Sequence, residues 1–305
     1  MLVVRGLAAE SSSSLSVDAV ALGNFDGVHL GHRAVLDRAK RYGRAAVYTF
    51  RPHPAKVLAP DRAPALLESY DRKIERLRDA GVAVVIEEPF DAAFAARSAE
   101  VFLETLFGAT KTRGIVVGAD FTFGHRREGN VGYLSAWGAR RRIDTAVVEP
   151  VLVDGGVVSS TRIRAALGAG DVALAARLLG RAPALRGVVV RGKERGRAIG
   201  FPTVNLATEN EAIPKTGVYV AVAQLATERR RAVVNIGHAP TFGANALTVE
   251  AHLFDFARDI YGETVELGLV SRLRDERPFG DVAELRAQIA ADCDRARAIA
   301  LGEAI

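Results

Sequence analysis

Cysteine is almost absent from this chain of 305 residues, which contains a single one, Cys293. One thiol cannot form an internal disulfide, so a disulfide-stapled secreted fold is excluded and a reducing compartment is expected. The sequence also lacks any apolar run near the roughly 18 residues that span a bilayer. The apolar stretch before the serines at 11–14 is too short for an export signal. We therefore expect a cytoplasmic protein without a membrane partner.

A large excess of one charge is also lacking. The formal net charge is +5, with 25 Lys and Arg against 20 Asp and Glu in residues 1–185, and 16 of each in residues 186–305. Such a small basic surplus suits a polyphosphate ligand or a nucleic acid. The arginine triplets at 140–142 and 229–231 have no aromatic residues among them, unlike a surface that stacks single-stranded bases. We interpret both triplets as solvated charge and expect no nucleic acid as partner. A homo-oligomer remains an alternative to a monomer.

Short apolar runs alternate with helical patterns in the first part of the chain. The apolar runs, interpreted as strands, cover 17–22, 45–49, 82–86, 114–117 and 145–151. The patterns with helical spacing cover 31–41, 69–80, 98–107 and 131–142, followed by a final pair of helices at 160–179. This alternation predicts a parallel sheet with helices on both faces, and ligands of such sheets bind at the carboxyl ends of the strands.

The pattern changes after residues 180–183, which we interpret as a linker. Beyond it, apolar runs separated by glycine and proline leave no room for helices, and these runs cover 186–190, 218–225, 232–236, 248–254 and 265–270. The spacing predicts an antiparallel barrel or sandwich. A final helix is expected over 281–300, with Cys293 on its apolar stripe in a structural role. The chain should therefore contain two domains, 1–182 and 183–305.

The most informative motif is Gly-Asn-Phe-Asp-Gly-Val-His-Leu-Gly-His at 23–32, directly after the first predicted strand. Its glycines permit a tight turn and a close approach of backbone to a ligand. Free N–H groups and the macrodipole at the start of the next helix favour a phosphate there. Two histidines three apart are weak evidence alone, since such residues are often structural, but the preceding strand and turn favour a nucleotide site. The residues expected to bind phosphate are Gly23, Phe25, Asp26, Gly27, His29, Gly31 and His32.

Two other segments are expected at the same edge of the sheet. Residues 118–124, Gly-Ala-Asp-Phe-Thr-Phe-Gly, follow the fourth predicted strand and contain Asp120. Residues 159–164, Ser-Ser-Thr-Arg-Ile-Arg, lead into a helix. Hydroxyls at a helix start are most often plain caps. Ser160 and Thr161, with Arg164 one turn on, also offer short donors and a planar cation for a pyrophosphate, so both interpretations stay open.

The second half contains a glycine-rich segment, Gly-Lys-Glu-Arg-Gly-Arg-Ala-Ile-Gly-Phe-Pro-Thr-Val-Asn at 192–205. Glu194 stands where a P-loop requires Ser or Thr, and no helix follows, so a P-loop is excluded. We interpret the segment as a flap over a nucleotide. It ends in Thr203 and Asn205, whose side chains point to one side of an extended chain and offer two oxygens that suit Mg²⁺.

Glu250 stands in a strand of alternating apolar residues, 249–256. A carboxylate there is either a surface residue of a half-exposed strand or, where it faces a ligand, a general base that takes a hydroxyl proton during phosphoryl transfer. His252 lies on the same face of the strand and is expected to be structural.

Taken in order, these motifs resemble those of the bifunctional prokaryotic riboflavin kinase and FMN adenylyltransferase family, usually called FAD synthetase. In the first half the resemblance rests on the motif at 23–32, Thr49-Phe50-x-Pro52-His53-Pro54, Gly118-x-Asp120-Phe121-x-Phe123-Gly124 and Ser159-Ser160-Thr161-x-Ile163-Arg164. In the second half it rests on Gly196-Arg197-x-x-Gly200-Phe201-Pro202-Thr203-x-Asn205, Asn235-Ile236-Gly237-x-x-Pro240-Thr241-Phe242, Glu250-x-His252 with Asp255-Phe256, Tyr261-Gly262 and Leu273-Arg274-x-Glu276. The resemblance spans nearly the whole chain.

The resemblance implies an α/β Rossmann-like nucleotidyltransferase domain at 1–182 and an antiparallel six-stranded flavokinase β-barrel with a C-terminal helix at 183–305. The barrel would phosphorylate riboflavin with Mg²⁺ and ATP, Glu250 acting as base and Thr203 and Asn205 holding the metal. The first domain would transfer AMP from ATP to FMN, giving FAD and pyrophosphate. Its catalytic residues would be His29, His32 and Arg164. The resemblance also implies that ATP or its phosphates contact Asp120, Ser160, Thr161, Gly192, Gly196 and Pro202.

Two other functions would leave different signatures. A chain that retained only one activity would be expected to have lost the histidine or the serine motif, and both are intact. A basic nucleic-acid-binding protein would bind DNA or RNA with steep salt dependence and would not turn over riboflavin.

Overall fold

The computed structural model describes residues 1–7, 15–192, 196, 199–239 and 246–300. Within it the chain forms two compact units. The first consists of residues 1–65 and 70–159, and the second of residues 66–69 and 160–305.

The first unit is built on a six-stranded parallel sheet with the order β1-β4-β3-β2-β5-β8. Its strands are β1 (Leu2–Arg5), β2 (Ala19–Leu22), β3 (Ala45–Arg51), β4 (Val84–Pro89), β5 (Gly114–Gly118) and β8 (Asp144–Val148). All neighbours in the sheet run parallel. The predicted strands are therefore confirmed, except that the last stops at Val148, two residues before Pro150, whose ring nitrogen cannot donate to a ladder. The edge strand β1 was missed, because it is short and largely exposed.

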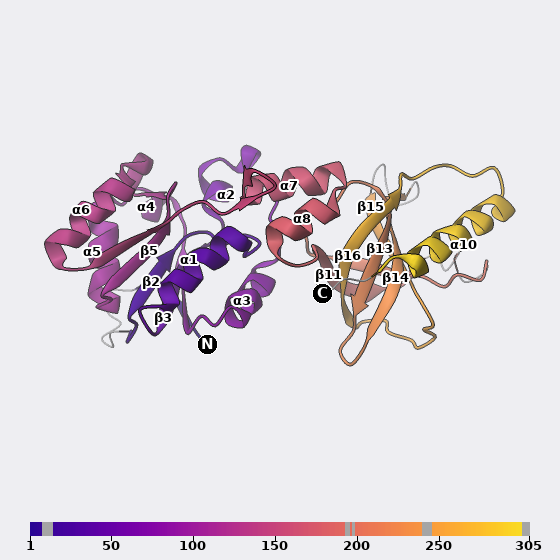
Figure 1. Cartoon of the computed structure of the whole chain (residues 1–305), viewed down its shortest axis with the longest axis horizontal. Helices are drawn as coiled ribbons and strands as arrows, with labels where there is room; N and C mark the ends of the chain where they lie inside the picture. The colour runs from indigo at the N-terminus through magenta and orange to yellow at the C-terminus, as the bar shows by residue number, and fades with distance from the viewer. Residues whose placement is uncertain (8–14, 193–195, 197–198, 240–245, 301–305) are drawn as a thin grey trace. The chain divides into compact units, whose positions relative to one another are not determined.

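Helices cover both faces of this sheet (Figure 1), as predicted. Alternate residues of each strand enter opposite cores: Val20 joins one and Ala21 the other. Helices α5 (Ala99–Thr110) and α6 (Val131–Arg141) pack on the first core, and α1 (Leu30–Lys40) and α3 (Tyr70–Asp79) on the second. The short elements are α2 (Pro54–Leu58), η1 (Pro60–Arg62), α4 (Ala92–Ala95), β6 (Thr122–Phe123), η2 (His125–Arg127), β7 (Gly129–Asn130), β9 (Leu152–Val153) and β10 (Gly156–Val157).

The strand order reverses at β2, which pairs with β3 on one side and β5 on the other. In open α/β sheets a ligand binds outside the carboxyl ends of the strands at such a reversal. The loops after β2 and β5 leave the sheet at this point, so the motifs at 23–32 and 118–124 start side by side.

The second unit contains a closed antiparallel barrel with the order β11-β12-β15-β14-β13-β16, which decides between the predicted barrel and sandwich. Its strands are β11 (Ala184–Val190), β12 (Val204–Thr208), β13 (Gly217–Gln224), β14 (Arg229–Ala239), β15 (Ala246–Leu253) and β16 (Thr264–Arg274). The apolar runs had indicated five of these strands. They did not show β12, whose residues are mostly half-exposed and follow the glycine-rich segment.

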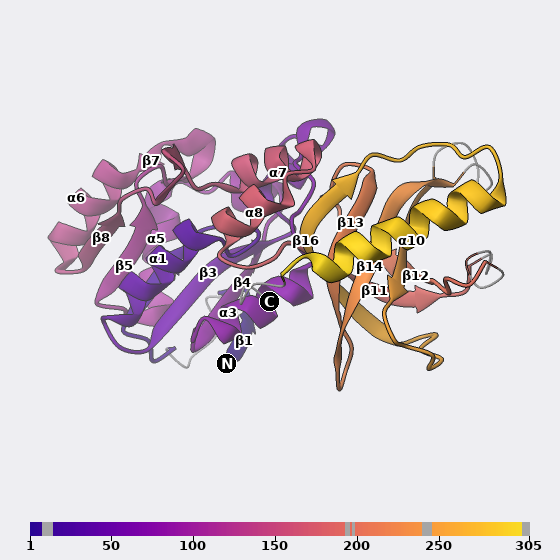
Figure 2. The ribbon, with the colours of Figure 1, turned by 45° about the vertical axis from the view of Figure 1, so that its right-hand side comes forward.

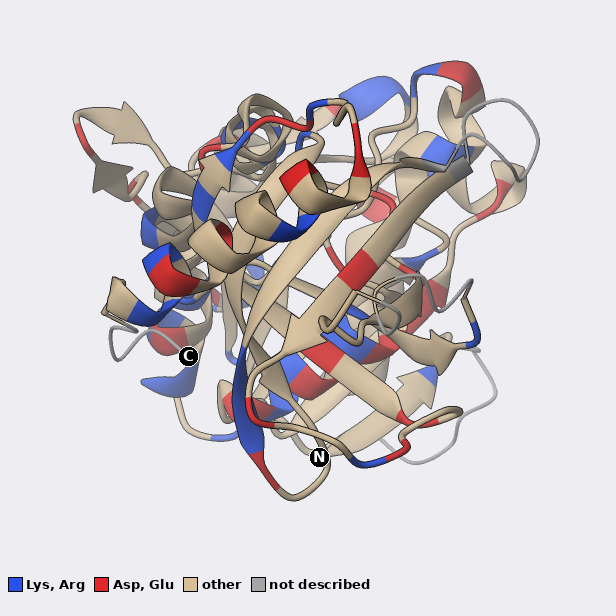
Figure 3. Cartoon of the chain, turned by 90° about the vertical axis from the view of Figure 1, so that its right-hand side faces the viewer, with Lys and Arg blue, Asp and Glu red and all other residues tan. Residues whose placement is uncertain are grey.

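The final helix, α10 (Val282–Ala298), lies along the barrel across β14 (Figure 2). Its residues Cys293 and Ala296 share an apolar cluster with Val233 of β14 and Phe254. Burial raises the pKa of the Cys293 thiol to about 11, which suits a side chain that packs rather than reacts. Acidic and basic residues are interspersed over the side of the barrel seen in Figure 3.

The pair of helices predicted at 160–179 is confirmed as α7 (Ser160–Ala169) and α8 (Val172–Leu179). The chain breaks between them because Gly170 adopts φ +81° and Asp171 caps α8 by accepting from Leu174 N at 2.8 Å. Both helices fall in the second unit, whereas the sequence analysis had placed them in the domain 1–182. The functional division at 182/183 stays a prediction.

Residues 66–69, which precede α3 in the chain, are fastened within the second unit by backbone and charged contacts. Leu66 O accepts from Ala212 N at 3.0 Å, and Leu67 O accepts from the Asn210 amide at 3.2 Å. Arg181 and Glu68 form an ion pair at 2.7 Å. A segment of the first half of the sequence is therefore a structural part of the barrel unit.

Candidate active sites

The chain leaving β2 makes a strained turn at the predicted phosphate site. Phe25 and Val28 adopt φ +53° and +36°, and Gly27 lies between them at φ +81°. Positive φ in residues other than glycine costs roughly 1–3 kcal/mol each, so the surroundings must hold the turn. Two donors hold the turn at a single carbonyl oxygen: Asn24 O accepts from Thr49 Oγ1 at 3.1 Å and from Lys73 Nζ at 3.3 Å.

The two histidines form a stacked pair at the start of α1. Their ring centroids are 3.6 Å apart with an interplanar angle of 13°. His29 caps the helix, because its Nδ1 accepts from His32 N at 3.2 Å. A neutral imidazole that accepts at Nδ1 carries its proton on Nε2. The cap therefore puts the ring proton of His29 on Nε2, at the start of the helix, where the macrodipole favours an anion.

Two glycines of this motif have close neighbours, so that a Cβ at either position would be tightly packed. A Cβ on Gly31 would lie 3.2 Å from the His29 ring and 3.5 Å from Val158 O. A Cβ on Gly23 would lie 3.2 Å from the Phe25 ring, and that ring lies 5.2 Å from the His32 ring. The turn, the phenylalanine and the histidine pair therefore pack as one group.

Lys73 is a residue of this region that the sequence analysis missed. It lies on α3, and its Nζ also contacts Thr49 Oγ1 at 3.2 Å. Desolvation lowers the pKa of the half-buried ammonium to about 8. No signal in the linear sequence pointed to it, because Lys73 and Asn24 are 49 positions apart.

The motif after β5 has two structural residues and one exposed carboxylate. Phe123 packs in the core, and Gly124 has φ +74° with a hypothetical Cβ 2.7 Å from Ala99 N. Asp120 is exposed just beyond the carboxyl end of β5. It thus stands next to the point where β2 ends, where the sequence placed it.

The serine motif begins a helix, as predicted. Ser160 is the first residue of α7, Thr161 is exposed and Arg164 is half-buried one turn later. Helix α7 itself belongs to the second unit. Within the first unit, Val158 O packs against Gly31, so the chain passes the start of α1 two residues before Ser160.

In the barrel, three polar side chains form a row across adjacent strands. Glu250 of β15 is directly opposite Asn205 of β12 on one side and Asn235 of β14 on the other. Directly paired residues lie on the same face of a sheet, with Cβ atoms about 4.5–5.5 Å apart. Val233, two residues before Asn235, packs against α10, so the row is on the outer face of the barrel. Glu250 is half-buried in this row rather than freely solvated.

Gly192 and Gly196 pack closely against the predicted metal ligands, Asn205 and Thr203. A Cβ on Gly192 would overlap the Asn205 amide, and one on Gly196 would overlap Phe201 O and approach Thr203 Oγ1 to 3.2 Å. The carbonyl of Pro202 contacts His252 Nδ1 at 2.8 Å, which gives this histidine a holding role in the same segment. The flap residues 193–195 and 197–198, and Pro240, Thr241 and Phe242 of the later motif, lie outside the described residues.

The donor set of this segment fits Mg²⁺. Thr203 and Asn205 supply hard oxygen ligands, and Mg²⁺ usually takes only one or two protein ligands, with phosphate and water completing its shell. Among the described residues there is no group of three or more His, Cys, Asp or Glu able to hold a metal ion.

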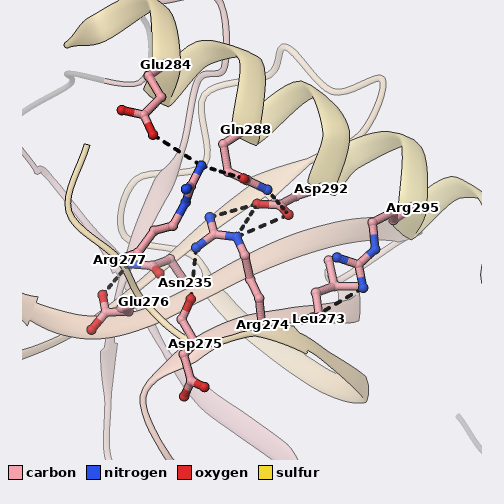
Figure 4. Close-up of polar contacts among 10 residues, drawn as sticks. All are labelled: Asn235, Leu273, Arg274, Asp275, Glu276, Arg277, Glu284, Gln288, Asp292 and Arg295. Carbon is pink, nitrogen blue, oxygen red and sulfur yellow. Dashed lines mark hydrogen bonds and ion pairs between the residues drawn. The ribbon is translucent and has the colours of Figure 1, made fainter. Parts of the chain in front are cut away.

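The loop after β16 extends the polar row (Figure 4). Glu276 Oε1 accepts from the Asn235 amide at 3.3 Å and lies so close to Gly237 that a Cβ there would overlap it. The loop is anchored to α10: Arg277 contacts Gln288 at 2.9 Å, and Arg274 pairs with the buried carboxylate of Asp292. The sequence had marked this segment only as part of a resemblance.

Comparison with known proteins decides the family. A sequence model of FAD synthetase matches residues 11–162, and one of riboflavin kinase matches residues 179–300. The bifunctional riboflavin kinase/FMN adenylyltransferase of Escherichia coli K12 is 38% identical over 299 residues, which are 96% of each chain. The protein of the same name from Bacillus subtilis is 36% identical over 283 residues, 90% of this chain and 89% of that one.

This chain belongs to the family of bifunctional riboflavin kinase/FMN adenylyltransferases. It is thus an enzyme of FAD biosynthesis, with the FAD synthetase segment first and the flavokinase segment second, as predicted. Flavins are its substrates and products.

A solved structure described as a macrolide-efflux protein from Streptococcus pneumoniae has the same fold, with a TM-score of 0.89 and 31% identity over 98% of this chain and all of that one. In the part of this chain that the structure describes, no helix is both long and apolar enough to cross a membrane.

Proposed function

We propose that the first unit's histidine pair holds ATP for adenylyl transfer. The observation that carries the proposal is the His29 cap, which puts the ring proton on Nε2 at a helix start whose polarity favours phosphate. Gly23, Phe25, Asp26, Gly27 and Gly31 shape the turn that admits the phosphates, and Asp120 stands beside it. The family resemblance adds Ser160, Thr161 and Arg164, which would stabilise the charge of the triphosphate.

In this step the phosphate of FMN attacks the α-phosphorus of ATP, and pyrophosphate leaves. The attacking phosphate is already anionic, so neither a base nor a covalent intermediate is needed. The protein's contribution is to hold two anions in line and to stabilise the charge that develops on the transferring group. We assign that task to His29 and His32.

We propose that the row Asn205, Glu250 and Asn235 is the kinase site. Glu250 accepts the proton of the ribityl 5′-hydroxyl of riboflavin as that oxygen attacks the γ-phosphorus of ATP. Thr203 and Asn205 would hold Mg²⁺, which when bound neutralises phosphate charge. Gly192 and Gly196 allow the flap backbone to lie on these two side chains, and His252 holds Pro202 in place.

The test is a product assay on the full chain. Purified protein is incubated with riboflavin and ATP, with and without Mg²⁺, and flavins are separated by chromatography. We expect FMN and then FAD with Mg²⁺, and no FMN in excess chelator. Equal FMN formation in chelator would refute the metal role of Thr203 and Asn205.

We further propose that the protein acts in the cytoplasm, where the single buried thiol of Cys293 stays reduced, and that it needs no nucleic acid. Cell fractionation tests the first statement. For the second, binding to duplex and single-stranded DNA is measured at about 50 and 200 mM salt, a range over which phosphate-dominated binding changes steeply.

A further inference from the structure

Lys73 carries a positive charge at the carboxyl edge of the first sheet, and the chemistry proposed above gives it no role. Its Nζ contacts Asn24 O at 3.3 Å and Thr49 Oγ1 at 3.2 Å. Asn24 lies just after β2, and Thr49 lies within β3. The ends of these two neighbouring strands flank the turn at which ATP is proposed to bind. The same Nζ lies 4.9 Å from the centroid of the Tyr70 ring, a cation–π contact.

Lys73 is connected to the histidine pair through the residues of the turn that follows β2. Asn24 O receives both donors, and the next residue, Phe25, has φ +53°. The Phe25 ring then lies 5.2 Å from that of His32, which is stacked on His29. A shift of the Asn24 carbonyl would therefore move the residue that sets the position of the pair.

Charged groups face Lys73 from several elements. Desolvation lowers the pKa of Lys73 to about 8, Arg51 at the end of β3 acts in the same direction, and the carboxylates of Asp26 and Glu87 oppose it. Tyr70 shares its helix, and burial together with the neighbouring Glu87 raises the pKa of its phenol, which keeps it neutral. The ammonium of Lys73 is partly desolvated and loses its proton near pH 8. Such a lysine is poorly suited to a purely structural contact.

We propose that Lys73 is a positioning residue for adenylyl transfer, which holds the Asn24 carbonyl, and through it the Phe25, His32 and His29 group, and places a positive charge behind the turn that receives the phosphates. The inference rests on the proposed ATP site of the first unit. It concerns the rate of FAD formation and leaves the kinase reaction untouched.

Three substitutions separate the parts of this role. K73M removes donor and charge, K73Q keeps a donor without the charge, and K73R keeps both. We expect K73M to slow FAD formation from supplied FMN by about 10–100-fold, the scale of a misplaced reacting group. K73Q should recover less than K73R, which should come within about fivefold of the wild type because the charge is retained.

Lys40 offers a matched control in the same unit. It lies at the far end of α1, and its Nζ also donates to a backbone carbonyl, Ala80 O, at 2.9 Å. That contact is at the amino edge of the sheet, where β3 begins. K40M should leave FAD formation within about twofold of the wild type, and FMN formation from riboflavin should be unchanged in every variant.

A pH profile distinguishes positioning by a charged amine from a simple packing role. The FAD-forming rate of the wild type should fall as pH rises through about 8, where Lys73 loses its proton, whereas arginine keeps its charge. The ratio of wild-type to K73R rate should therefore fall by at least about threefold between pH 7 and 9.5. Groups that titrate in both proteins cancel in this ratio.

The outcomes are decisive in either direction. A K73M protein that keeps the wild-type unfolding temperature and FMN formation but makes FAD slowly supports the role. FAD formation at the wild-type rate in K73M, or a pH-independent ratio, overturns it. If K73M does not fold, the ratio of wild type to K73R still decides. A wild-type protein that makes FMN but no FAD would instead refute the proposed ATP site itself.

Discussion

Arg274 at the end of β16 and Asp292 in α10 form a two-pronged ion pair on the outer face of the barrel. Nε and Nη2 of the arginine lie 2.9 and 2.8 Å from Asp292 Oδ2, and the Asp292 side chain is 2% exposed. Gln288 donates to the other carboxylate oxygen at 3.0 Å. The pair joins the helix to the strand that leads into Glu276, and so connects α10 to the polar row proposed as the kinase site (Figure 4).

Breaking this pair should destabilise the protein strongly. D292N leaves the Arg274 guanidinium without its counter-charge, and removing one partner of a buried pair costs about 3–5 kcal/mol. The free energy of unfolding is measured by urea denaturation of the full chain. D294N is the control, since Asp294 is exposed on the same helix and its loss should cost less than about 0.5 kcal/mol. Equal values for both variants would show that the pair contributes nothing specific.

Glu250→Gln should slow FMN formation by about 10²–10⁴-fold, because an amide cannot take the hydroxyl proton. Adenylylation of supplied FMN should continue at the wild-type rate. E266Q, in β16, is the matched control and should phosphorylate riboflavin normally. A folded E250Q protein in which both steps fall together, or in which the kinase step is unaffected, contradicts the assignment of the base.

Replacing His29 and His32 together by alanine should abolish FAD while FMN accumulates. Loss of one well-placed donor to a developing charge costs about 10²–10³ in rate, and the double variant removes the pair. His125, an exposed histidine of the first unit, provides the control in H125A. Chromatography of the flavins after incubation with riboflavin and ATP measures both steps at once, and undiminished FAD in the double variant would exclude the histidines from the site.

Fragments test the division between the domains. We predict that residues 184–305 phosphorylate riboflavin without the first half. The second unit also contains α7 and α8, with Leu178 and Leu179 buried, so a fragment of residues 160–305 should be the more stable of the two. Thermal unfolding and FMN formation are measured for both. Soluble, folded fragments that make no FMN would show that the barrel depends on the first half.

The pH dependence of unfolding gives an independent view of Lys73. Its pKa is about 8 in the folded protein against an ordinary value of 10.5, so the unfolded chain binds more protons between these values. The stability that Lys73 contributes therefore rises as pH increases through this window. The difference in unfolding free energy between wild type and K73M should shift in favour of the wild type from pH 8 to 10. A difference that is flat or of opposite sign would mean that the ammonium is not desolvated.

Local patterns predicted much of the fold because they report on local physics. Runs such as 17–22 and 114–117 are buried on both faces of a parallel sheet, and their composition shows this directly. The same patterns failed where burial is weak, as in β1 and β12. The choice between barrel and sandwich depends on whether β11 pairs with β16, which no single segment reveals.

The sequence by itself determined the two classes of sheet, the motif order and the residue types at both sites. Only the tertiary structure showed which of those residues meet. Asn205, Glu250 and Asn235 align because three strands share one register, and Glu276 joins them because a loop is anchored to α10. Lys73 reaches Asn24 because α3 packs beside β2 and β3. Such contacts join segments tens of residues apart, whereas the periodicity of a segment records only which of its own faces is buried.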